Sequence, residues 1–572
     1  MNEENGWFQL ESQIPVKNLR ENRKKTSPDH NSPHQKEQKQ APPMSHCSTG
    51  KTNEKRSYDD DAAAGRQQQR NAPYAPDFAD SSNRMPNLNE SNWEAPPNRY
   101  SDSFHSRSRM TDSDVMPDAM DHMADMPLTW AEDRHLHTRH SQTVGPEGPV
   151  LEQDSTLHEA LEIFTHTKIL ERPLHVKGFG AFGYFQTMYS MREYTKLCFL
   201  QTPGLQVPVM VRFSLAAGNK GTPDTSRNVR GLAIKFYTDE GVFDFVGNHI
   251  PVLFVRDGVR FPQAITSLTP SPVNNLTDPE RFWRFFATAP EATHFVTWLY
   301  SDVGTVKSFR HIRGFGVNTF VWRNAQGERR YVKYHWIPLA GEETINRQQA
   351  VELAGKNPDI AGRDLFDTIA SGRPVQYDLC VQLMDPSDEN YLPFDPLDCT
   401  KTWDEQQYPL IPVGRLTLNR NPVDYMEQIE KVAFSPANLL DGAELSDDKL
   451  LQARANIYWD SQRHRLGKDF RKLPVNCQKD WTPDDLVTSG SEKYVEGHLV
   501  RSPIQRSDNF TQAGQRYMSL SAEEKNHLID NLAADLVLVN AGLRRTVLKY
   551  FYSASPEFGQ RVANRIAEYA RM

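Results

Sequence analysis

The feature that most limits the possible folds is a series of short strand-like segments between residues 205 and 385. They are rich in Val, Ile, Phe, Tyr and Thr and are separated by Gly, Asn and Pro, a pattern typical of β-strands joined by turns. The segments are VPVMVRFSLA, GLAIKFYT, GVFDFVG, IPVLFVRD, NTFVWRN, ERRYVKYHWIPL and VQYDLCVQLMD, with a hairpin-like NAQGE between two of them. Helix-like stretches such as PERFWRFFATAPEATHFVTWLYS are inserted rather than alternating with each strand. We therefore expect an α+β fold in which an antiparallel sheet closes into a barrel.

The other parts of the chain differ from this central part in composition. Residues 1–126 are rich in Asn, Gln, Ser, Pro, Arg and Asp and poor in branched apolar residues, so burial would not offset the entropy lost on ordering. We expect a disordered or partner-draped N-terminal extension there. The other expected parts are an N-terminal arm at 127–204, the β-barrel at 205–385, a wrapping segment rich in Pro, Asp and Asn at 386–500, and a C-terminal helical unit at 501–572.

Two helix starts can be read in the C-terminal unit. Ser521 and Glu524 have the spacing of a capping box before HLIDNLAADLVLVNA. Ser555 precedes Pro556, and a second helix is expected to run from there through RVANRIAEYA. Both helices are therefore predicted to begin at a serine N-cap.

The formal net charge of −8 gives no general attraction to nucleic acid or to anionic membranes. Apolar runs such as VPVMV and ADLVLV are broken well before the roughly 20 residues that span a bilayer. The first residues, MNEENGWFQLESQ, lack the basic and then apolar pattern of a signal peptide. We therefore expect a cytoplasmic protein with a small or neutral substrate and no nucleic-acid or membrane partner.

The stretch RPLHVKGFGAFGYF contains Gly178, Gly180 and Gly183 at the GxGxxG spacing of dinucleotide-binding loops. Such a loop also needs a following helix packed on a parallel strand and an acidic residue about twenty positions later. YFQTMYSMREYTKLCFLQTPG follows instead, and the strand-like segments come next. The glycines are therefore interpreted as positions where the backbone passes close to something flat or bulky.

Two patterns nearer the N-terminus suggest phosphate or metal binding. STGKT at 48–52 lacks the first glycine of a phosphate-binding loop, because Ser45 stands at that position. His135, His137 and His140 have the residue type for a metal site, but alternating histidines in a polar segment are more often simply solvated. The phosphate loop is thus rejected, and the metal site stays open as the weaker interpretation.

RANIYWDSQRHRLG at 454–467 is a stronger candidate. On a helix, Arg454 and Tyr458 would share one face, and a neighbouring guanidinium favours phenolate over phenol. A run of Arg and His on a helix is more often a solvated surface, so a functional interpretation needs matching groups elsewhere. Other segments supply a base, a hydroxyl, a carboxamide, an aromatic ring and further guanidinium groups: His175, Ser214, Asn248, Phe261, Arg172 and Arg212.

Taken together, these stretches resemble the monofunctional haem catalases. The resemblance runs from residue 141 to the C-terminus through ERPLHVKGFGAFGYF, VRFS, DTSRNVRGLAIKFYTDEG, VGNHIPVLFVRD, RDLFDTIASG, YPLIPVGRLTLNRNP and RANIYWDSQRHRLG. It implies the catalase fold, an eight-stranded antiparallel β-barrel with helical insertions, a long wrapping segment and a C-terminal helical unit. It also implies disproportionation of hydrogen peroxide to water and dioxygen, as protection against peroxide stress.

The resemblance further implies a haem b cofactor and a role for each candidate residue. Tyr458 would be the iron ligand as a phenolate, which is the known ligation of catalases, and Arg454 would stabilise it. The other implied contacts are a ring stacked on the porphyrin and three propionate partners: Phe261, Arg172, Arg212 and Arg465.

On the opposite face of the haem, the resemblance places His175 and Asn248. His175 would move a proton from one peroxide oxygen to the other, Asn248 would hold the peroxide, and Ser214 would orient the imidazole. The implied reaction passes through a ferryl porphyrin-radical intermediate, which a second peroxide reduces as it leaves as dioxygen.

Three positions depart from the family pattern. Asn228 stands where many relatives have an aspartate in the access channel. Val303 and Ile337 replace an arginine and a lysine that are typical of relatives that bind NADPH, which argues against bound NADPH. Because family members are typically tetramers whose N-terminal arms thread through neighbouring subunits, the resemblance also implies a homotetramer.

Two other functions stay open from the sequence. Some catalase-related proteins turn over fatty-acid hydroperoxides, although the wrapping segment and the helical tail resemble true catalases. A degenerate catalase fold could also serve as a haem store or a structural coat protein. Against this, Tyr458, His175 and Asn248 are all present.

Overall fold

The computed structural model describes residues 169–271, 273–477, 504 and 506–571. The predictions for residues 1–126, which include STGKT, and for the histidines at 135, 137 and 140 lie outside these residues. The part of the predicted N-terminal arm that precedes residue 169 lies outside them as well.

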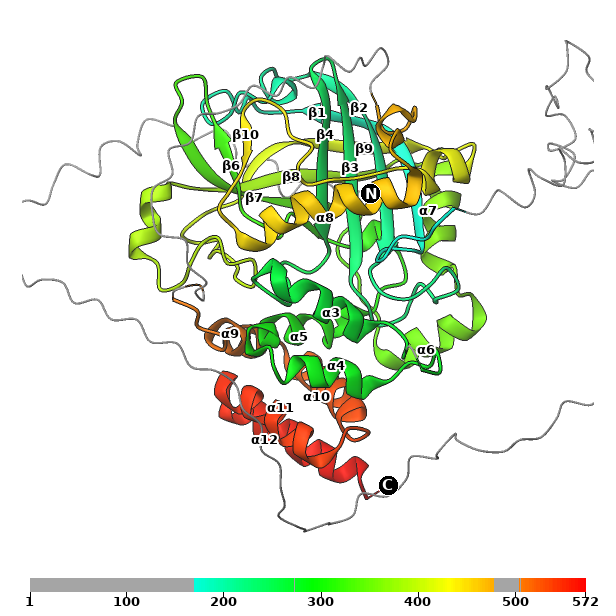
Figure 1. Cartoon of the computed structure of the whole chain (residues 1–572), viewed down its shortest axis with the longest axis vertical. Helices are drawn as coiled ribbons and strands as arrows, with labels where there is room; N and C mark the ends of the chain where they lie inside the picture. Colours follow the sequence, from blue (N-terminus) through cyan, green and yellow to red (C-terminus); the bar gives the residue numbers. More distant parts are fainter. Residues whose placement is uncertain (1–168, 272, 478–503, 505, 572) are drawn as a thin grey trace, which may run out of the picture. The chain divides into compact units, whose positions relative to one another are not determined.

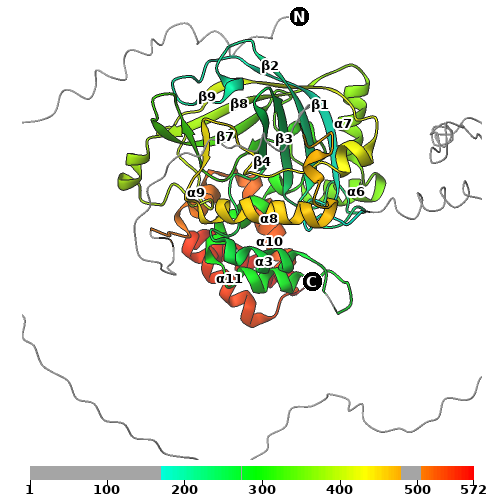
Figure 2. The ribbon, with the colours of Figure 1, turned by 45° about the horizontal axis from the view of Figure 1, so that its top comes forward.

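Eight antiparallel strands close into a barrel (Figures 1 and 2). Each strand pairs with the next, and the last pairs with the first. In order around the barrel they are β1 (Gly178–Thr187), β2 (Gln206–Leu215), β3 (Arg230–Thr238), β4 (Gly241–Asn248), β5 (Gly314–Phe315), β7 (Arg329–Pro338), β8 (Val375–Met384) and β9 (Ile411–Arg420). Two short strands, β6 (Phe320–Arg323) and β10 (Ala443–Leu445), extend the sheet beside β7. The predicted barrel is thus confirmed.

The predicted bounds of the barrel, 205–385, are too narrow at both ends. The strand β1 lies before residue 205, and β9 lies after residue 385, where the wrapping segment was expected. Local composition did not indicate either strand. Glycines interrupt the apolar pattern of β1, whereas β9 lies in a segment rich in Pro and Asn.

One predicted strand is absent from the described residues. IPVLFVRD at 250–257 is buried but irregular, because it leaves β4 and crosses to the helical insertion instead of pairing in the sheet. Its Leu253 amide donates to the carbonyl oxygen of Cys399 at 2.9 Å. The continuous apolar run therefore predicted burial correctly, but the prediction that it pairs as a β-strand was wrong.

The barrel interior is a packed aromatic and aliphatic core. Phe185, Phe236 and Trp336 are at most 1% exposed. The ring of Phe185 makes edge contacts with those of Phe236 and Trp336, with centroids 5.6 and 6.0 Å apart. Since side chains alternate along each strand, the neighbouring residues point to the outer face, where a ligand site can form.

Helices cover one side and one end of the barrel (Figure 1). Among the described residues, three α-helices lie between β4 and β5, two lie between β7 and β8, and five follow β9. They are α3 (Phe261–Leu268), α4 (Pro279–Phe286), α5 (Thr293–Leu299), α6 (Arg347–Lys356), α7 (Ile360–Ala370), α8 (Lys449–Leu466), α9 (Thr511–Ser519), α10 (Ala522–Leu536), α11 (Ala541–Ala554) and α12 (Pro556–Tyr569). In the part of the chain that the structure describes, no helix has the length and apolar character needed to cross a membrane.

The C-terminal helices pack on the inserted helices α4 and α5 through a second core (Figure 1). Trp283 and Phe286 of α4 and Phe551 of α11 belong to this core and are fully buried. Ser521 forms the predicted capping box with Glu524, and the side chain of Ser555 accepts a hydrogen bond at the start of α12. Both predicted helix starts are therefore confirmed.

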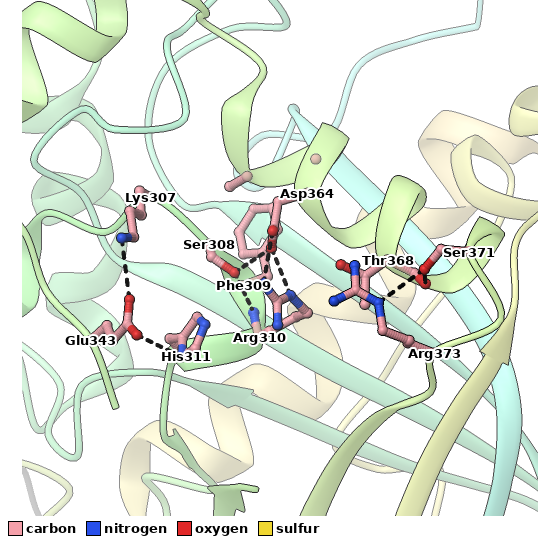
Figure 3. A network of polar contacts seen from close by, with 12 residues as sticks. Lys307, Ser308, Phe309, Arg310, His311, Glu343, Asp364, Thr368, Ser371 and Arg373 are labelled. Carbon is pink, nitrogen blue, oxygen red and sulfur yellow. Dashed lines mark hydrogen bonds and ion pairs between the residues drawn. The ribbon is translucent and has the colours of Figure 1, made fainter. Parts of the chain in front are cut away.

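A polar network fixes the loop that leads into β5 (Figure 3). Asp364 of α7 accepts hydrogen bonds from both Nε and Nη2 of Arg310, each at 2.8 Å, and another from Ser308 at 2.5 Å. Nearby, Lys307 forms an ion pair with Glu343 at 3.3 Å. A bidentate Arg–carboxylate pair has a defined geometry, so this network holds the loop before β5 against α7.

Candidate active site

A cavity of about 220 Å³ lies between the outer face of β2–β4, the inserted helices α3 and α5, and α8. Eight of the nine residues expected to form the site line it: Arg172, His175, Arg212, Ser214, Asn248, Phe261, Arg454 and Tyr458. Arg465 does not line the cavity but lies behind its wall, as described below. Segments that are almost 300 residues apart in the sequence thus meet at one place.

Strand register places the polar groups of one cavity face. Ser214 on β2 is opposite Gly231 on β3, and Gly231 is in turn opposite Asn248 on β4. The hydroxyl and the carboxamide therefore flank a glycine in a row across three strands. The imidazole of His175 lies against this row, with Nδ1 2.9 Å from the Ser214 Oγ.

Gly231 provides the space for that contact. A Cβ at this position would lie 2.5 Å from the Ser214 Oγ and 2.7 Å from the His175 Nδ1, closer than such atoms can approach. Sequence reasoning did not single out Gly231, although a glycine inside a strand pattern can signal a close backbone approach.

The backbone of His175 has a left-handed conformation with a φ of 61°. This conformation is uncommon for a residue other than glycine and costs about 1–3 kcal/mol, so surrounding contacts must enforce it. Arg212 provides them, because its Nη1 donates to the His175 carbonyl at 2.9 Å and its Nη2 to the Val176 carbonyl at 3.1 Å. The buried arginine of β2 therefore fixes the direction of the imidazole.

The imidazole of His175 is neutral at physiological pH. Burial, together with the positive charges of Arg212, Arg454 and Arg172, lowers its pKa to about 3. A neutral imidazole has one nitrogen free to accept a proton. Because Nδ1 faces Ser214, the nitrogen available to a ligand is Nε2.

On the opposite side of the cavity, α8 presents Tyr458. The Arg454 side chain lies one turn earlier and donates from Nε to the Tyr458 oxygen at 3.1 Å, with a second, shorter contact from Nη2. The Arg454 Nη1 donates to the Asn318 Oδ1 at 2.7 Å, and the Asn318 Nδ2 donates to the Asp448 Oδ2 at 2.6 Å. Asp448 also caps α8 through its contacts with the amides of residues 450 and 451.

Sequence reasoning missed Asn318 and Asp448. The aspartate has a readable signal, because it precedes an apolar helix start as an N-cap would. Asn318 has none, because it lies 136 positions before Arg454 in the sequence.

Three buried guanidinium groups gather at one end of the site. Arg172 and Arg465 both donate to the backbone carbonyls of Glu430 and Val432, and Arg212 lies close enough to repel both charges. Burial lowers the pKa of Arg212 and of Arg465 to about 9. The carboxylate beside these groups is Glu430, 3.3 Å from the Arg172 Nη1. The other oxygen of Glu430 lies 3.7 Å from the Lys220 Nζ, so among the described residues the cations of the cluster outnumber its carboxylate.

The glycines of the GxGxxG pattern have a structural role away from the cavity. They lie in β1, which pairs with β2 and β9 on its two sides, and none of them lines the cavity. A Cβ on Gly178 would lie 2.4 Å from the Arg212 Cζ, so the bulky neighbour expected at this glycine is an arginine side chain. The absence of a nucleotide-binding turn here agrees with the sequence analysis.

Comparison with known proteins adds independent findings. The catalase family model matches residues 131–503, and the model described as catalase-related immune-responsive matches residues 503–566. This chain is 38% identical over 460 residues to a catalase of Helianthus annuus, covering 75% of this chain and 94% of the relative.

The chain belongs to the catalase family.

It is also 38% identical over 455 residues to a catalase of Listeria seeligeri, covering 74% of this chain and 93% of that relative. A solved bacterial catalase has a TM-score of 0.72 and 34% identity, covering 79% of this chain and 99% of that one. Catalase A from Saccharomyces cerevisiae has a TM-score of 0.70 and 31% identity, covering 75% of this chain and 96% of that one. The protein is therefore a haem enzyme that decomposes hydrogen peroxide.

The site of this catalase fits a haem group. Haem carries two negatively charged propionates, and the cluster of Arg172, Arg212 and Arg465 has more positive than negative charge. The Nε atoms of Arg212 and Arg465 are also buried and have no hydrogen-bond partner among the described residues. A buried cation without a partner is costly, so a dianionic group at this end would relieve that cost.

Asn228 lines the cavity as well. Its Nδ2 donates to the Ala217 carbonyl at 2.8 Å, and its Oδ1 accepts from the Ala217 amide at 3.0 Å. An aspartate could accept from this amide but could not donate to the carbonyl. The asparagine therefore makes a pair of contacts that the aspartate of many relatives could not make.

Replacing Gly231 with alanine should lower turnover per bound haem by about 100-fold, because displacing a catalytic group by about 1 Å has an effect of this order. Haem content should be unchanged, since Gly231 faces His175 rather than α8. Oxygen evolution normalised to haem absorbance measures both. Gly355→Ala is the matched control, because a Cβ at Gly355 meets nothing within 4 Å. Full turnover in Gly231→Ala would contradict the role assigned to this glycine.

Acidification should destabilise the protein through four histidines, His175, His249, His294 and His335, whose pKa values are lowered to about 3, chiefly by removal from water. In the unfolded chain a histidine has a pKa of about 6.5. Above about pH 6.5 these histidines are neutral in both the folded and the unfolded state and do not lower the free energy of unfolding. As the pH falls towards 3, the unfolded state binds protons that the folded state does not, so the free energy of unfolding decreases.

The urea midpoint of unfolding should consequently be lower at about pH 5 than at about pH 7.5, by roughly 1 M or more. Asp448, Asp244 and Asp395 act in the opposite direction, since burial raises the pKa of each carboxyl, that of Asp448 to about 6, but they are three groups against four histidines. Tryptophan fluorescence would follow the transition. An equal midpoint at both pH values would show that these histidines do not stay neutral in the folded state.

Proposed function

We propose that this catalase binds haem b in the cavity, with Tyr458 as the iron ligand and His175 on the opposite face. The observation that supports this most strongly is the pairing of two sets of groups across one cavity. On one side α8 carries Tyr458 with the guanidinium of Arg454 against its oxygen. On the other side β2 and β4 carry Ser214 and Asn248 beside the imidazole.

Arg454 is proposed to keep Tyr458 as a phenolate, because a guanidinium that donates to the oxygen favours the charged form. Phe261 at the start of α3 is proposed to stack on the porphyrin. Arg172, Arg212 and Arg465 are proposed to neutralise the propionates, Arg465 from behind the wall of the cavity. When bound, haem supplies an iron that takes the peroxide oxygen and changes its oxidation state.

The protein groups then handle the protons. The neutral imidazole of His175 is proposed to take a proton from one peroxide oxygen at Nε2 and to deliver it to the other oxygen, which leaves as water. The Asn248 amide donates to the peroxide and holds it beside the imidazole. Ser214 keeps the ring in orientation through Nδ1.

A second hydrogen peroxide is then oxidised to dioxygen, and its two protons and two electrons convert the oxygen atom kept from the first peroxide into the second water. His175 is proposed to accept and return a proton in this step too. Two molecules of hydrogen peroxide thus give two of water and one of dioxygen. The side chains end in their initial protonation states.

An absorbance spectrum of the purified protein, together with an oxygen-electrode trace, tests this proposal. We expect a haem spectrum, about one haem b per chain by pyridine haemochrome analysis, and oxygen release from hydrogen peroxide. Linoleic acid hydroperoxide, as a comparison substrate, should react far more slowly. A colourless protein that releases no oxygen after haem supplementation would refute the proposal.

We further propose a cytoplasmic homotetramer without bound NADPH. Exposed apolar side chains such as Val423 and Tyr391, 89% and 86% exposed in the single chain, favour burial against other subunits. The apolar residues Val303 and Ile337 offer no cation for a dinucleotide phosphate. Sedimentation should give four times the mass of the chain, and NADPH fluorescence should be unchanged on mixing. Cell fractionation would test the compartment.

A further inference from the structure

A strained turn stands behind the tyrosine side of the cavity. Val317, between β5 and β6, has a φ of 62°, and the amide of Asn318 donates to the Gly316 carbonyl at 2.7 Å. A hydrogen bond from residue i+2 to residue i around a central residue with positive φ is the arrangement of a classic γ-turn, which is rare and strained. A β-branched residue is an outlier in this region of φ, so other contacts must hold the turn.

The turn determines where Asn318 points. Asn318 is fully buried, accepts from Arg454 at 2.7 Å and donates to Asp448 at 2.6 Å. Arg454 in turn donates to the oxygen of Tyr458. If residue 317 left the left-handed region, the Asn318 carboxamide would leave the Arg454 guanidinium.

Strand β7 holds this turn from outside. The Lys333 Nζ donates to the Val317 carbonyl at 2.9 Å, and the carbonyl of the next residue, Tyr334, accepts from the Gly316 amide at 2.9 Å. Lys333 is only 6% exposed, also donates to the Lys401 carbonyl at 3.3 Å, and lies 5.5 Å from the centre of the Trp403 ring.

The charge of Lys333 is unusual in its surroundings. Among the described residues it has no ion-pair partner within 4 Å, and both of its hydrogen bonds go to backbone carbonyls. Burial lowers its pKa, and the nearby Cys399, Asp448 and Asp398 oppose this shift. Burying an ammonium group is costly, and packing alone would be served by an apolar side chain.

We propose that Lys333 is a positioning residue of the tyrosine side of the site, which clamps Val317 in its left-handed conformation so that Asn318 keeps Arg454 on the oxygen of Tyr458. His175 on the other face shows the same device, since Arg212 donates to the carbonyl of that left-handed residue. Both faces of the cavity thus depend on a strained residue whose carbonyl is held by a buried cation. The inference rests on the proposed role of Tyr458 as the iron ligand.

The test compares Lys333→Met, Val317→Gly and the double variant in the full-length, haem-loaded protein. The readouts are the rate of haem loss to excess apomyoglobin and turnover per bound haem. We expect Lys333→Met to lose haem about 10-fold faster, since removal of an outer-shell partner typically weakens a metal site by 10–100-fold. Glycine adopts positive φ without strain, so Val317→Gly in the same chain should restore the rate to within about twofold of the wild type.

The rescue separates positioning from packing. Val317 is 3% exposed, so Val317→Gly removes buried side-chain volume and should lower the thermal midpoint alone and in combination. A lysine that acted only through packing or stability would therefore not be rescued by this change. A double variant that loses haem as fast as Lys333→Met, or faster, would overturn the proposal, and so would a Lys333→Met that keeps haem like the wild type.

Lys401→Met is the matched control. Lys401 is 2% exposed, and its ammonium donates to the carbonyl of Asp508, away from the turn. We expect lower stability and unchanged haem loss; a rate as fast as that of Lys333→Met would show that any buried lysine has this effect and would refute the proposal. If Lys333→Met does not fold, Lys333→Gln replaces it, because it removes the buried ammonium that holds the Val317 carbonyl, with the same expected rescue. Failure of the Tyr458 role itself is detected separately, by Tyr458→Phe retaining haem and its wild-type spectrum.

Discussion

Replacing His175 with alanine should lower oxygen evolution per bound haem by about 10²–10⁴-fold, the usual contribution of a general acid–base group. The variant loses the Nε2 that is proposed to accept the peroxide proton, but it keeps Tyr458 and the arginine cluster, the groups proposed to hold the haem. The absorbance spectrum should therefore still show bound haem. An oxygen electrode, with rates normalised to haem, measures the loss.

His335→Gln is the matched control for this change. His335 is also buried, and its pKa is likewise lowered to about 3, but it bonds to Gln382 inside the sheet and does not line the cavity. We expect it to lose stability and to keep turnover. The turnover of Ser214→Ala should lie between those of the two histidine variants, roughly 10-fold below the wild type, because the imidazole stays in place without its orienting partner. Unchanged turnover in His175→Ala would exclude this residue as the proton carrier.

Replacing Tyr458 with phenylalanine should have the second large effect, because it removes the proposed iron ligand. Haem affinity should fall by more than the 10–100-fold that loss of an outer-shell partner costs. It would also leave the Arg454 guanidinium without the oxygen that two of its nitrogens contact. We expect the purified variant to contain little haem and to release almost no oxygen, as measured by pyridine haemochrome and oxygen electrode.

Tyr550→Phe provides the comparison. The Tyr550 hydroxyl donates to the Ala287 carbonyl at 2.6 Å, within the C-terminal helices and their contacts, and the residue does not line the cavity. Its loss should cost about 1 kcal/mol of stability and no haem. A Tyr458→Phe variant with full haem content and an unaltered spectrum would show that another residue holds the iron.

The sequence predicted the barrel because its central strands are rich in β-branched and aromatic residues and are bounded by turns. It did not predict β1 or β9, since local composition argued against a strand and only pairing with distant strands stabilises them. The inserted helix shows the same limit. The stretch PERFWRFFATAPEATHFVTWLYS, expected as one helical segment, breaks into α4 and α5 around Pro290.

The residues of the candidate site likewise fall into two groups, those predicted from the sequence and those found only in the structure. Residues such as His175 and Tyr458 lie in motifs that resemble those of catalases, so they were expected, and the structure brings them to one cavity. Gly231 lies in such a motif but has no side chain that points to a role, and Asn318 and Lys333 lie outside the quoted motifs. The importance of all three arises from neighbours far away in the chain. Arg465 was expected and lies in the arginine cluster, but behind the cavity wall, where its Nη1 and Nη2 donate to the carbonyls of Glu430 and Val432.

The row of Ser214, Gly231 and Asn248 has a consequence for how activity can be lost. Side chains alternate between the two faces of a strand, so a slip of one residue in the pairing of β2, β3 or β4 would turn a polar group into the barrel core and an apolar one towards the peroxide. No intermediate register retains part of the site. In a partly misfolded or ageing sample, each molecule should therefore be either fully active or inactive. A decline in specific activity should then be proportional to the loss of molecules with the correct strand register, while the turnover of each remaining molecule stays unchanged.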